Sequence, residues 1–179
     1  MARLSLLLMW LTAAQPGTLT LSSPAFANNG PLPVEYTGYG AFTSPPLAWT
    51  GAPKGTRQFV LIVEDTDAPL ASLSVHWLIY NIPATAASLP ATPPNKAAKT
   101  HPAPIAGARL GRNAMKWLGY LPPRPFAATG VHHYRFTLYA VGTELTLAEG
   151  ATRADVLAAV NGHVLAEATL VAVFERKEP

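Results

Sequence analysis

The chain contains no cysteine, so it cannot form a disulfide framework, a thiolate zinc site or a cysteine nucleophile. It is also poor in charge, since only 13% of its residues are charged, and the 13 basic residues exceed the 10 acidic ones without forming a run. This balance permits attraction to small anions. The scattered basic side chains and the lack of an aromatic-plus-basic surface motif argue against a nucleic-acid partner.

Proline and glycine are abundant instead, with 18 and 13 residues in a chain of 179. In a chain with so few charges, this content favours the turns and long loops of an all-β domain and argues against long helices. The apolar content of 49% is ample for one buried core, whereas two full domains would be cramped at this length.

The N-terminal residues have the layout of a secretory signal peptide. Arg3 precedes the apolar stretch Leu4–Leu11, and small residues follow. We therefore expect a signal peptide at residues 1–14, a single domain at 15–179, and a periplasmic or secreted protein. The alternative is an N-terminal strand or tail on a cytoplasmic protein. The stretch is too short to span a bilayer, and no later segment could be transmembrane.

Two continuous β-branched and aromatic runs predict strands that are buried on both faces, and these two strands should form the centre of a sheet. They are Phe59–Val63 and Val75–Ile82, the second of which is halted by Pro83. The segment Tyr134–Val141 alternates polar and apolar residues, which predicts a strand with unequal faces beside that pair. Further strands are expected at Leu19–Leu21 and Ala168–Phe174.

One helix of about three turns is expected near the C-terminus. Thr152 and Asp155 have the spacing of a capping box, and a short apolar stripe precedes Gly162. By contrast, Pro83–Pro104 is dominated by alanine, proline and threonine, which predicts a long surface connection without core residues.

Polar groups stand at the ends of the two central strands, where a rigid scaffold can direct them into one pocket. Asp65 and Asp67 directly follow the first strand, and His76 lies within the second. Simpler roles compete with ligand binding at these positions. An aspartate before a turn often caps backbone amides, which we expect of Asp67, and a lone histidine in an apolar strand is more often a hydrogen-bonded core residue.

A third group of polar residues begins the later strand. Alternation places His132 and Tyr134 on one face and His133 on the other, so that two hydrogen-bond donors point the same way. Because His132 and His133 face apart, they cannot easily share a metal ion, and Asp65 and His76 lack a metal-binding spacing. No serine lies in a nucleophile-elbow pattern either. We therefore expect no enzymatic activity, no metal and no cofactor.

Four motifs in this order resemble the phosphatidylethanolamine-binding proteins, also called Raf kinase inhibitor proteins, and especially their bacterial branch. The resemblance runs from about Leu19 to Phe174, and the matching segments are Ser44–Trp49, Asp65–Pro69, His76–Pro83 and Gly119–Tyr134. It implies a mainly β fold, namely a sandwich with a large central antiparallel sheet, a smaller second sheet and a short C-terminal helix.

The same resemblance implies a pocket for phosphate or another small anion. Its ligand-binding residues would be Asp65, His76, His132 and Tyr134, with Pro69 and Tyr120 as walls. Two histidines and a tyrosine hydroxyl suit an anion, whereas the Asp65 carboxylate is suited to accept a proton from a histidine ring and so fix its tautomer. Ala68–Pro69 resembles the cis-proline turn of the family, although the sequence cannot show the isomer.

The chain departs from the family in the segment Leu121–Arg124, which replaces a glycine-containing loop. Pro122 and Pro123 have no amide proton and cannot donate a backbone hydrogen bond to an anion. Our hypothesis is that Arg124 supplies the missing positive group.

These observations favour a non-enzymatic binding protein for a phosphorylated small molecule or a phospholipid head group. A regulatory or inhibitory protein that acts on a kinase or protease partner is the alternative, as some relatives imply. Its contact surfaces would be the loops Pro83–Pro104 and Pro122–Thr129.

Overall fold

The computed structural model describes residues 18–71, 74–94 and 102–177, so the expected signal peptide lies outside the described residues. Strands make up most of the regular structure, with a single 3-10 turn and one α-helix in the described ranges. In chain order the elements are β1 (Thr20–Ser22), β2 (Gly30–Pro31), η1 (Val34–Tyr36), β3 (Leu47–Thr50), β4 (Gln58–Asp65), β5 (Val75–Pro83), β6 (Ser88–Leu89), β7 (Arg109–Leu110), β8 (Val131–Val141), α1 (Arg153–Val160) and β9 (Val164–Glu175).

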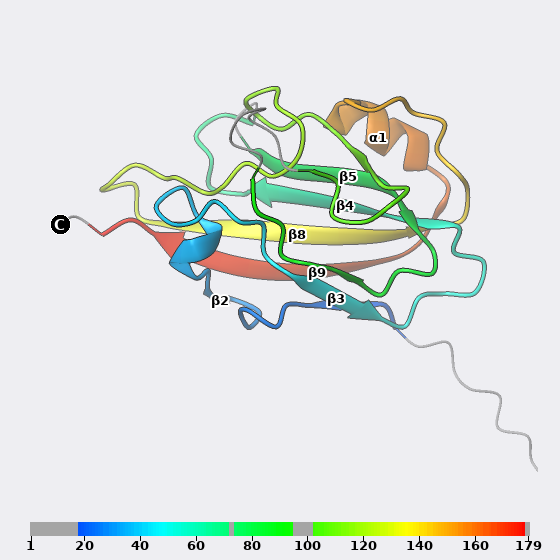
Figure 1. Ribbon diagram of the computed structural model, residues 1–179, viewed down its shortest axis with the longest axis horizontal. Helices are drawn as coiled ribbons and strands as arrows, with labels where there is room; N and C mark the ends of the chain where they lie inside the picture. The colour runs from blue at the N-terminus through cyan, green and yellow to red at the C-terminus, as the bar shows by residue number, and fades with distance from the viewer. Residues whose placement is uncertain (1–17, 72–73, 95–101, 178–179) are drawn as a thin grey trace, which may run out of the picture.

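The strands form two sheets, as expected. The large sheet has six strands in the order β2-β9-β8-β4-β5-β7, and the small sheet has three in the order β1-β3-β6. All pairs are antiparallel except β2 with β9. Figure 1 shows β5, β4, β8 and β9 side by side, with α1 above β5 and the small-sheet strand β3 beyond β9. The two predicted central strands are neighbours inside the sheet, and β8 lies beside β4.

Both faces of the large sheet are covered, which explains why β4 is a continuous apolar run. Phe59, Leu61 and Val63 belong to the core cluster that includes the small-sheet residues Leu47 and Trp49. The alternate residues of β4 belong to a second cluster with α1, which contributes Val156 and Val160. Because successive side chains of a strand point to opposite faces, one strand serves two cores.

The C-terminal elements differ in length from the prediction. The capping box is present, because the Thr152 hydroxyl accepts from the Asp155 amide while the Asp155 carboxylate accepts from the Thr152 amide. The helix has 8 residues, only a little over two turns, and the chain turns at Gly162 in the left-handed region with a φ of 77°. Strand β9 begins at Val164 because it pairs with β8 along the whole length of that strand.

The prediction for Pro83–Pro104 was wrong in one respect, because part of this connection belongs to the core. It contains β6, whose Leu89 is 1% exposed and packs in the same cluster as the small sheet. Thr92 is also buried, and its carbonyl accepts a hydrogen bond of 2.9 Å from the Ser44 amide. One leucine among alanines and prolines forms no periodic pattern, so its burial depends on strand pairing that the sequence does not display.

Strand β5 carries an irregularity near each of its ends. Its pairing with β4 shifts by one residue between Val75 and Trp77, and again between Ile79 and Ile82. The extra residue at each shift moves the following side chains to the other face, as a β-bulge does. Val75 therefore packs on the α1 side while Trp77 packs on the small-sheet side. Bulges of this kind can redirect a side chain, and His76 lies at the first one.

Candidate functional site

A cavity of about 280 Å³ lies where β4 ends and where β5 and β8 begin. It brings together six of the seven predicted site residues, which come from four separate parts of the chain. The six are Asp65, Pro69, His76, Arg124, His132 and Tyr134. The register explains part of this assembly, because Asp65 pairs directly with Tyr134 across β4 and β8.

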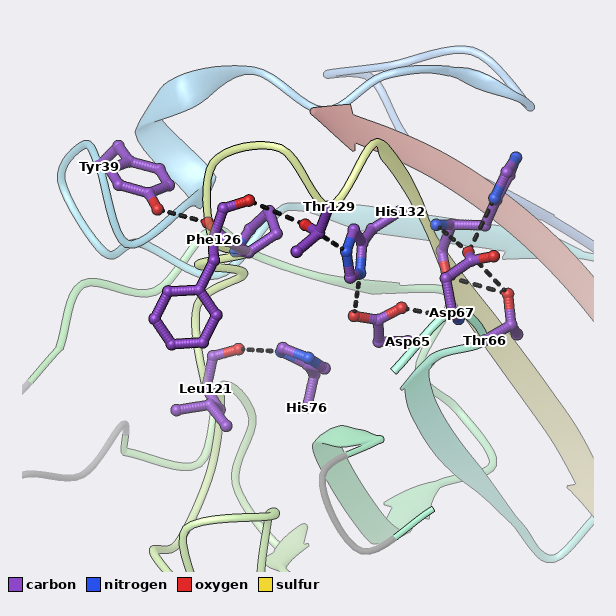
Figure 2. Close-up of polar contacts among 11 residues, drawn as sticks. Tyr39, Asp65, Thr66, Asp67, His76, Leu121, Phe126, Thr129 and His132 are labelled. Atoms are coloured by element: carbon purple, nitrogen blue, oxygen red, sulfur yellow. Dashed lines mark hydrogen bonds and ion pairs between the residues drawn. The ribbon is translucent and has the colours of Figure 1, made fainter. Parts of the chain in front are cut away.

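The buried pair of Asp65 and His132 anchors the cavity. His132 Nδ1 lies 2.7 Å from Asp65 Oδ2, and both residues are buried. On the other side of the ring, Nε2 lies 2.9 Å from the Thr129 hydroxyl, which donates to the Phe126 carbonyl at 2.8 Å (Figure 2). The expected role of Asp65 as the partner of a histidine ring thus has the required geometry, and both nitrogens of His132 are engaged.

The Thr129 hydroxyl can bond to His132 Nε2 in either direction. A hydroxyl has one proton to donate. When Thr129 donates it to the Phe126 carbonyl, the Thr129 oxygen is left to accept from Nε2. When Thr129 turns that proton toward the ring, Nε2 accepts instead. A ligand that binds Nε2 therefore has to replace Thr129.

The His76 ring is held in place by a hydrogen bond at its Nδ1 atom. Its Nδ1 lies 2.7 Å from the Leu121 carbonyl, so the neutral ring donates from Nδ1 and presents Nε2 as an acceptor (Figure 2). Burial lowers the pKa of His76, although the Leu121 hydrogen bond and the charge of Asp65 act in the opposite direction. The simpler sequence interpretation, a hydrogen-bonded histidine in an apolar strand, is correct for Nδ1, and the residue also lines the cavity.

The Tyr134 hydroxyl is buried beside the Asp65 carboxylate and forms no hydrogen bond of normal geometry among the described residues. The residue is 1% exposed, and its ring packs edge-on against His76 with centroids 5.1 Å apart. Burial raises the pKa of Tyr134, and the nearby Asp65 carboxylate raises it further. The hydroxyl therefore keeps its proton at neutral pH and is available as a donor.

Tyr120 is the predicted residue that the described structure places outside the cavity. Its ring packs edge-on against Trp77 at 5.3 Å, and its hydroxyl donates to the Tyr36 carbonyl at 2.7 Å. The residue is buried in the main core cluster. Tyr120 therefore supports the loop beneath the site, and the expected wall is formed instead by Leu121 and Pro122.

Arg124 lies at the rim of the cavity, with its guanidinium carbon 5.6 Å from the centre of the Tyr39 ring. The Tyr39 hydroxyl donates to the Pro125 carbonyl at 2.6 Å, which ties this loop to the N-terminal part of the domain (Figure 2). A second arginine, Arg176, lies 5.0 Å from the same ring centre. The prolines of this loop have no amide proton to donate, while Arg124 supplies a positive group packed against Tyr39.

A second histidine–aspartate pair lies beside the first but on the surface. His133 donates from its main-chain amide and Nδ1 to Asp67 Oδ2, at 2.7 and 2.9 Å. Partial burial alone raises the pKa of Asp67, but these hydrogen bonds and the nearby histidines lower it on balance. Asp67 thus accepts from an amide of β8, whereas the cap at the turn itself is Asp65, whose Oδ1 accepts from the Asp67 amide at 2.9 Å. The adjoining Ala68–Pro69 bond is trans, since no described peptide bond is cis.

Sequence reasoning missed the residues that complete the cavity. Thr129, Met115 and Phe126 all line it, and Phe126 is 80% exposed at its mouth. They come from loops without periodicity, so no sequence signal assigned them. Within the described ranges, no group of three or more histidine, cysteine or acidic side chains lies close enough to hold a metal ion. No helix in these ranges is long and apolar enough to cross a membrane.

Comparison with known proteins identifies relatives over most of the chain. A protein from Methanothermobacter thermautotrophicus, named UPF0098 protein, is 39% identical over 158 residues, which cover 88% of this chain and 99% of that protein. LppC of Mycobacterium tuberculosis, whose name marks it as a candidate lipoprotein, is 38% identical over 164 residues, covering 91% of this chain and 74% of LppC.

Solved structures agree with the fold. YbcL of E. coli, described as a new member of the mammalian PEBP family, superposes with a TM-score of 0.78 at 31% identity, covering 89% of this chain and 99% of YbcL. A homologue from Chlamydia trachomatis, CT736, gives a TM-score of 0.77 at 33% identity over 89% and 99% of the two chains. The profile of the family described as Phosphatidylethanolamine-binding protein matches residues 22–175. This chain therefore belongs to the phosphatidylethanolamine-binding protein family.

Proposed function

We propose that this protein binds a small phosphate-bearing anion, either a phosphorylated small molecule or a phospholipid head group, without chemical change. The observation that carries the proposal is the Tyr134 hydroxyl, which is buried at the cavity beside the Asp65 carboxylate and forms no hydrogen bond of normal geometry among the described residues. A buried donor without an acceptor is unfavourable, and an anion in the cavity would supply that acceptor.

The other lining groups complement Tyr134. Arg124 contributes a positive charge at the rim, and His132 contributes Nε2 once a ligand oxygen replaces the Thr129 hydroxyl. Asp65 keeps the His132 ring oriented from behind. Hydrogen bonds from charged donors to a phosphate oxygen are stronger than neutral ones, which favours an anion over a neutral guest.

The protonation state of His76 should make phosphate affinity depend on pH. Its neutral Nε2 accepts, so it pairs with the hydroxyl of a protonated phosphate, whereas a fully ionised phosphate requires a protonated His76. Because burial lowers the pKa of His76, that proton is present only under acidic conditions. Affinity for phosphate should therefore fall as the pH rises from 5.5 to 8.

Calorimetric or NMR titration of phosphate and phosphoethanolamine into the purified protein tests the proposal. Tyr134→Phe removes one oxygen and should weaken binding about tenfold or more, since a hydrogen bond to a charged group contributes about 1.5–3 kcal/mol. His133→Ala is the matched control, because His133 lies on the opposite strand face and should leave affinity unchanged. The proposal would be refuted if binding were not saturable at either pH 5.5 or pH 8, or if Tyr134→Phe bound with unchanged affinity.

A regulatory role toward a kinase or protease is the second candidate. The observation that favours it is Phe126, a large apolar side chain that is 80% exposed on the loop at the cavity mouth. A partner that contacts this loop should lose affinity for Phe126→Ala while tolerating Tyr134→Phe. Pull-down with both variants separates this role from anion binding, and equal recovery of the same proteins by wild type and Phe126→Ala would exclude the contact.

Export to the periplasm or the medium is part of the proposed function. The layout of residues 1–14 and the similarity to LppC support it. The N-terminal sequence of mature protein recovered from cell fractions should begin close to residue 15. A full-length chain confined to the cytoplasm would refute export.

A further inference from the structure

A second cavity, of about 540 Å³, lies at the opposite end of the large sheet. Among its lining residues are Gln58, at the start of β4, and Asn81, near the end of β5. The anion cavity begins at Asp65, at the other end of β4, seven residues away and therefore roughly 23 Å along the strand. The two cavities share no lining residue.

Two carboxamides define the chemistry of this cavity. The Gln58 Nε2 group donates to the Thr143 carbonyl at 2.7 Å, and Asn81 Nδ2 donates to the Leu145 carbonyl at 3.2 Å. These bonds fix the orientation of both amides, because a carbonyl can only accept. The oxygens Gln58 Oε1 and Asn81 Oδ1 are consequently buried acceptors, and neither has a hydrogen-bond partner among the described residues. Gln58 itself is only 4% exposed.

The backbone at Asn81 directs its side chain to this place at a conformational cost. Asn81 has a φ of 54°, in the left-handed region, and lies at the second pairing shift between β4 and β5. The first shift of β5 lies at His76, which lines the anion cavity. Bulges occur preferentially beside functional sites, and strained residues persist where the surrounding structure holds them. Strand β5 therefore has a pairing shift near each end, and each shift lies beside a cavity.

The charged residues around the cavity are free of ionic partners. Arg57, Arg109 and Glu144 line it, and none of them forms an ion pair within the described ranges. Arg109 donates one guanidinium hydrogen to the Leu147 carbonyl and keeps four others. Two positive groups, one negative group and two carbonyl acceptors suit a guest with an anionic group and a cationic N–H donor.

We infer that this cavity is a second binding site, which takes a small zwitterion of amino-acid or dipeptide size. The carboxylate of the guest pairs with Arg57 and Arg109, and its ammonium group pairs with the Glu144 carboxylate. The ammonium group also donates to the oxygens of Gln58 and Asn81 when these buried side chains shift toward the cavity. The cavity volume lies in the usual range for small-molecule sites. This site is independent of the proposed anion site.

Titration of glycylglycine into ¹⁵N-labelled protein tests the inference, because the side-chain amides of Gln58 and Asn81 report directly in the NMR spectrum. N-acetylglycylglycine and glycylglycinamide serve as probes of similar size that keep only the negative or only the positive charge. We expect saturable shifts of both side-chain amides with glycylglycine and at least tenfold weaker binding of each single-charge probe. Equal binding of a single-charge probe, or no saturable shift with glycylglycine, would overturn the inference.

Two variants locate the binding. Asn81→Gly removes the carboxamide while glycine accepts the left-handed backbone, so the fold is retained and binding should drop about tenfold or more. Arg57→Gln should give a similar loss. Lys54→Gln is the matched control, because it removes the same charge from the neighbouring turn without lining the cavity. An equal loss in Lys54→Gln would show non-specific attraction and reject the site, and Tyr134→Phe should have no effect.

Discussion

Two neighbouring histidine–aspartate pairs offer an internal comparison of the same interaction in two environments. The Asp65–His132 distance is 2.7 Å with both side chains 8% exposed, whereas the Asp67–His133 distance is 2.9 Å with side chains 41% and 48% exposed. Both pairs join the end of β4 to the beginning of β8. Residue types and geometry are therefore nearly matched, and solvent exposure is the variable.

The coupling free energies should differ accordingly. A buried, charge-assisted hydrogen bond contributes about 1.5–3 kcal/mol to the free energy of unfolding, which we expect for Asp65 with His132. An exposed ion pair contributes about 0.2–1 kcal/mol, because water screens the charges and two side chains must be ordered. The buried pair should thus be coupled more strongly by at least about 0.5 kcal/mol, roughly a twofold difference in the folding equilibrium.

Two double-mutant cycles measure these couplings. Alanine replaces each partner singly and both together, and urea unfolding at pH 7 gives the free energy of unfolding for each variant. The additional bond from the Asp67 amide to Asp65 Oδ1 is lost in both variants that lack Asp65, so it cancels in the cycle. Equal coupling in the two pairs, or stronger coupling in the exposed pair, would refute the assignment of Asp65–His132 as a buried charge-assisted bond.

Three further predictions concern protonation and packing. Burial holds the pKa of His76 below 6.5 in the folded chain, so the unfolded chain binds more protons near that pH. The free energy of unfolding, measured with urea, should therefore fall as the pH is lowered from 7.5 to 5. It should fall less in His76→Gln. Burial raises the pKa of Tyr134, so the ultraviolet difference titration of wild type minus Tyr134→Phe should show no phenolate near pH 10 while the protein stays folded. Leu89→Ala should cost about 2–5 kcal/mol in thermal or urea unfolding, whereas Leu165→Ala, at a position 45% exposed, should cost far less; similar losses would contradict the burial of Leu89.

The strands could be predicted from the sequence where burial is continuous. Phe59–Val63 and Val75–Ile82 are apolar throughout because helix α1 and the small sheet cover both faces of the large sheet. Leu89 could not be predicted, because a strand of two residues has no period. The same limit applies to the early start of β9 at Val164, which depends on the length of its partner strand.

In the candidate site too, residues on strands could be predicted better than residues in loops. Strand alternation could place His132 and Tyr134 on one face, whereas the position of Asp65 opposite Tyr134 depends on the pairing of β4 with β8. Tyr120 lies in a loop, and its position in the core depends on Trp77 and on the Tyr36 carbonyl, which are distant in the chain. Thr129 was missed for the same reason, because its bond to His132 exists only in the folded loop.

The loop between Leu121 and Gly130 therefore decides what the cavity accepts. The strands fix the positions of Tyr134 and the Asp65–His132 pair, but Thr129 already holds His132 Nε2 and the Leu121 carbonyl already holds His76 Nδ1. The proposed anion would meet the buried Tyr134 hydroxyl beside Asp65 and would have to replace Thr129 to reach His132. Since a ligand gains only the difference between its own bond and the one it replaces, affinity depends on how easily Thr129 turns away, and this loop controls that motion.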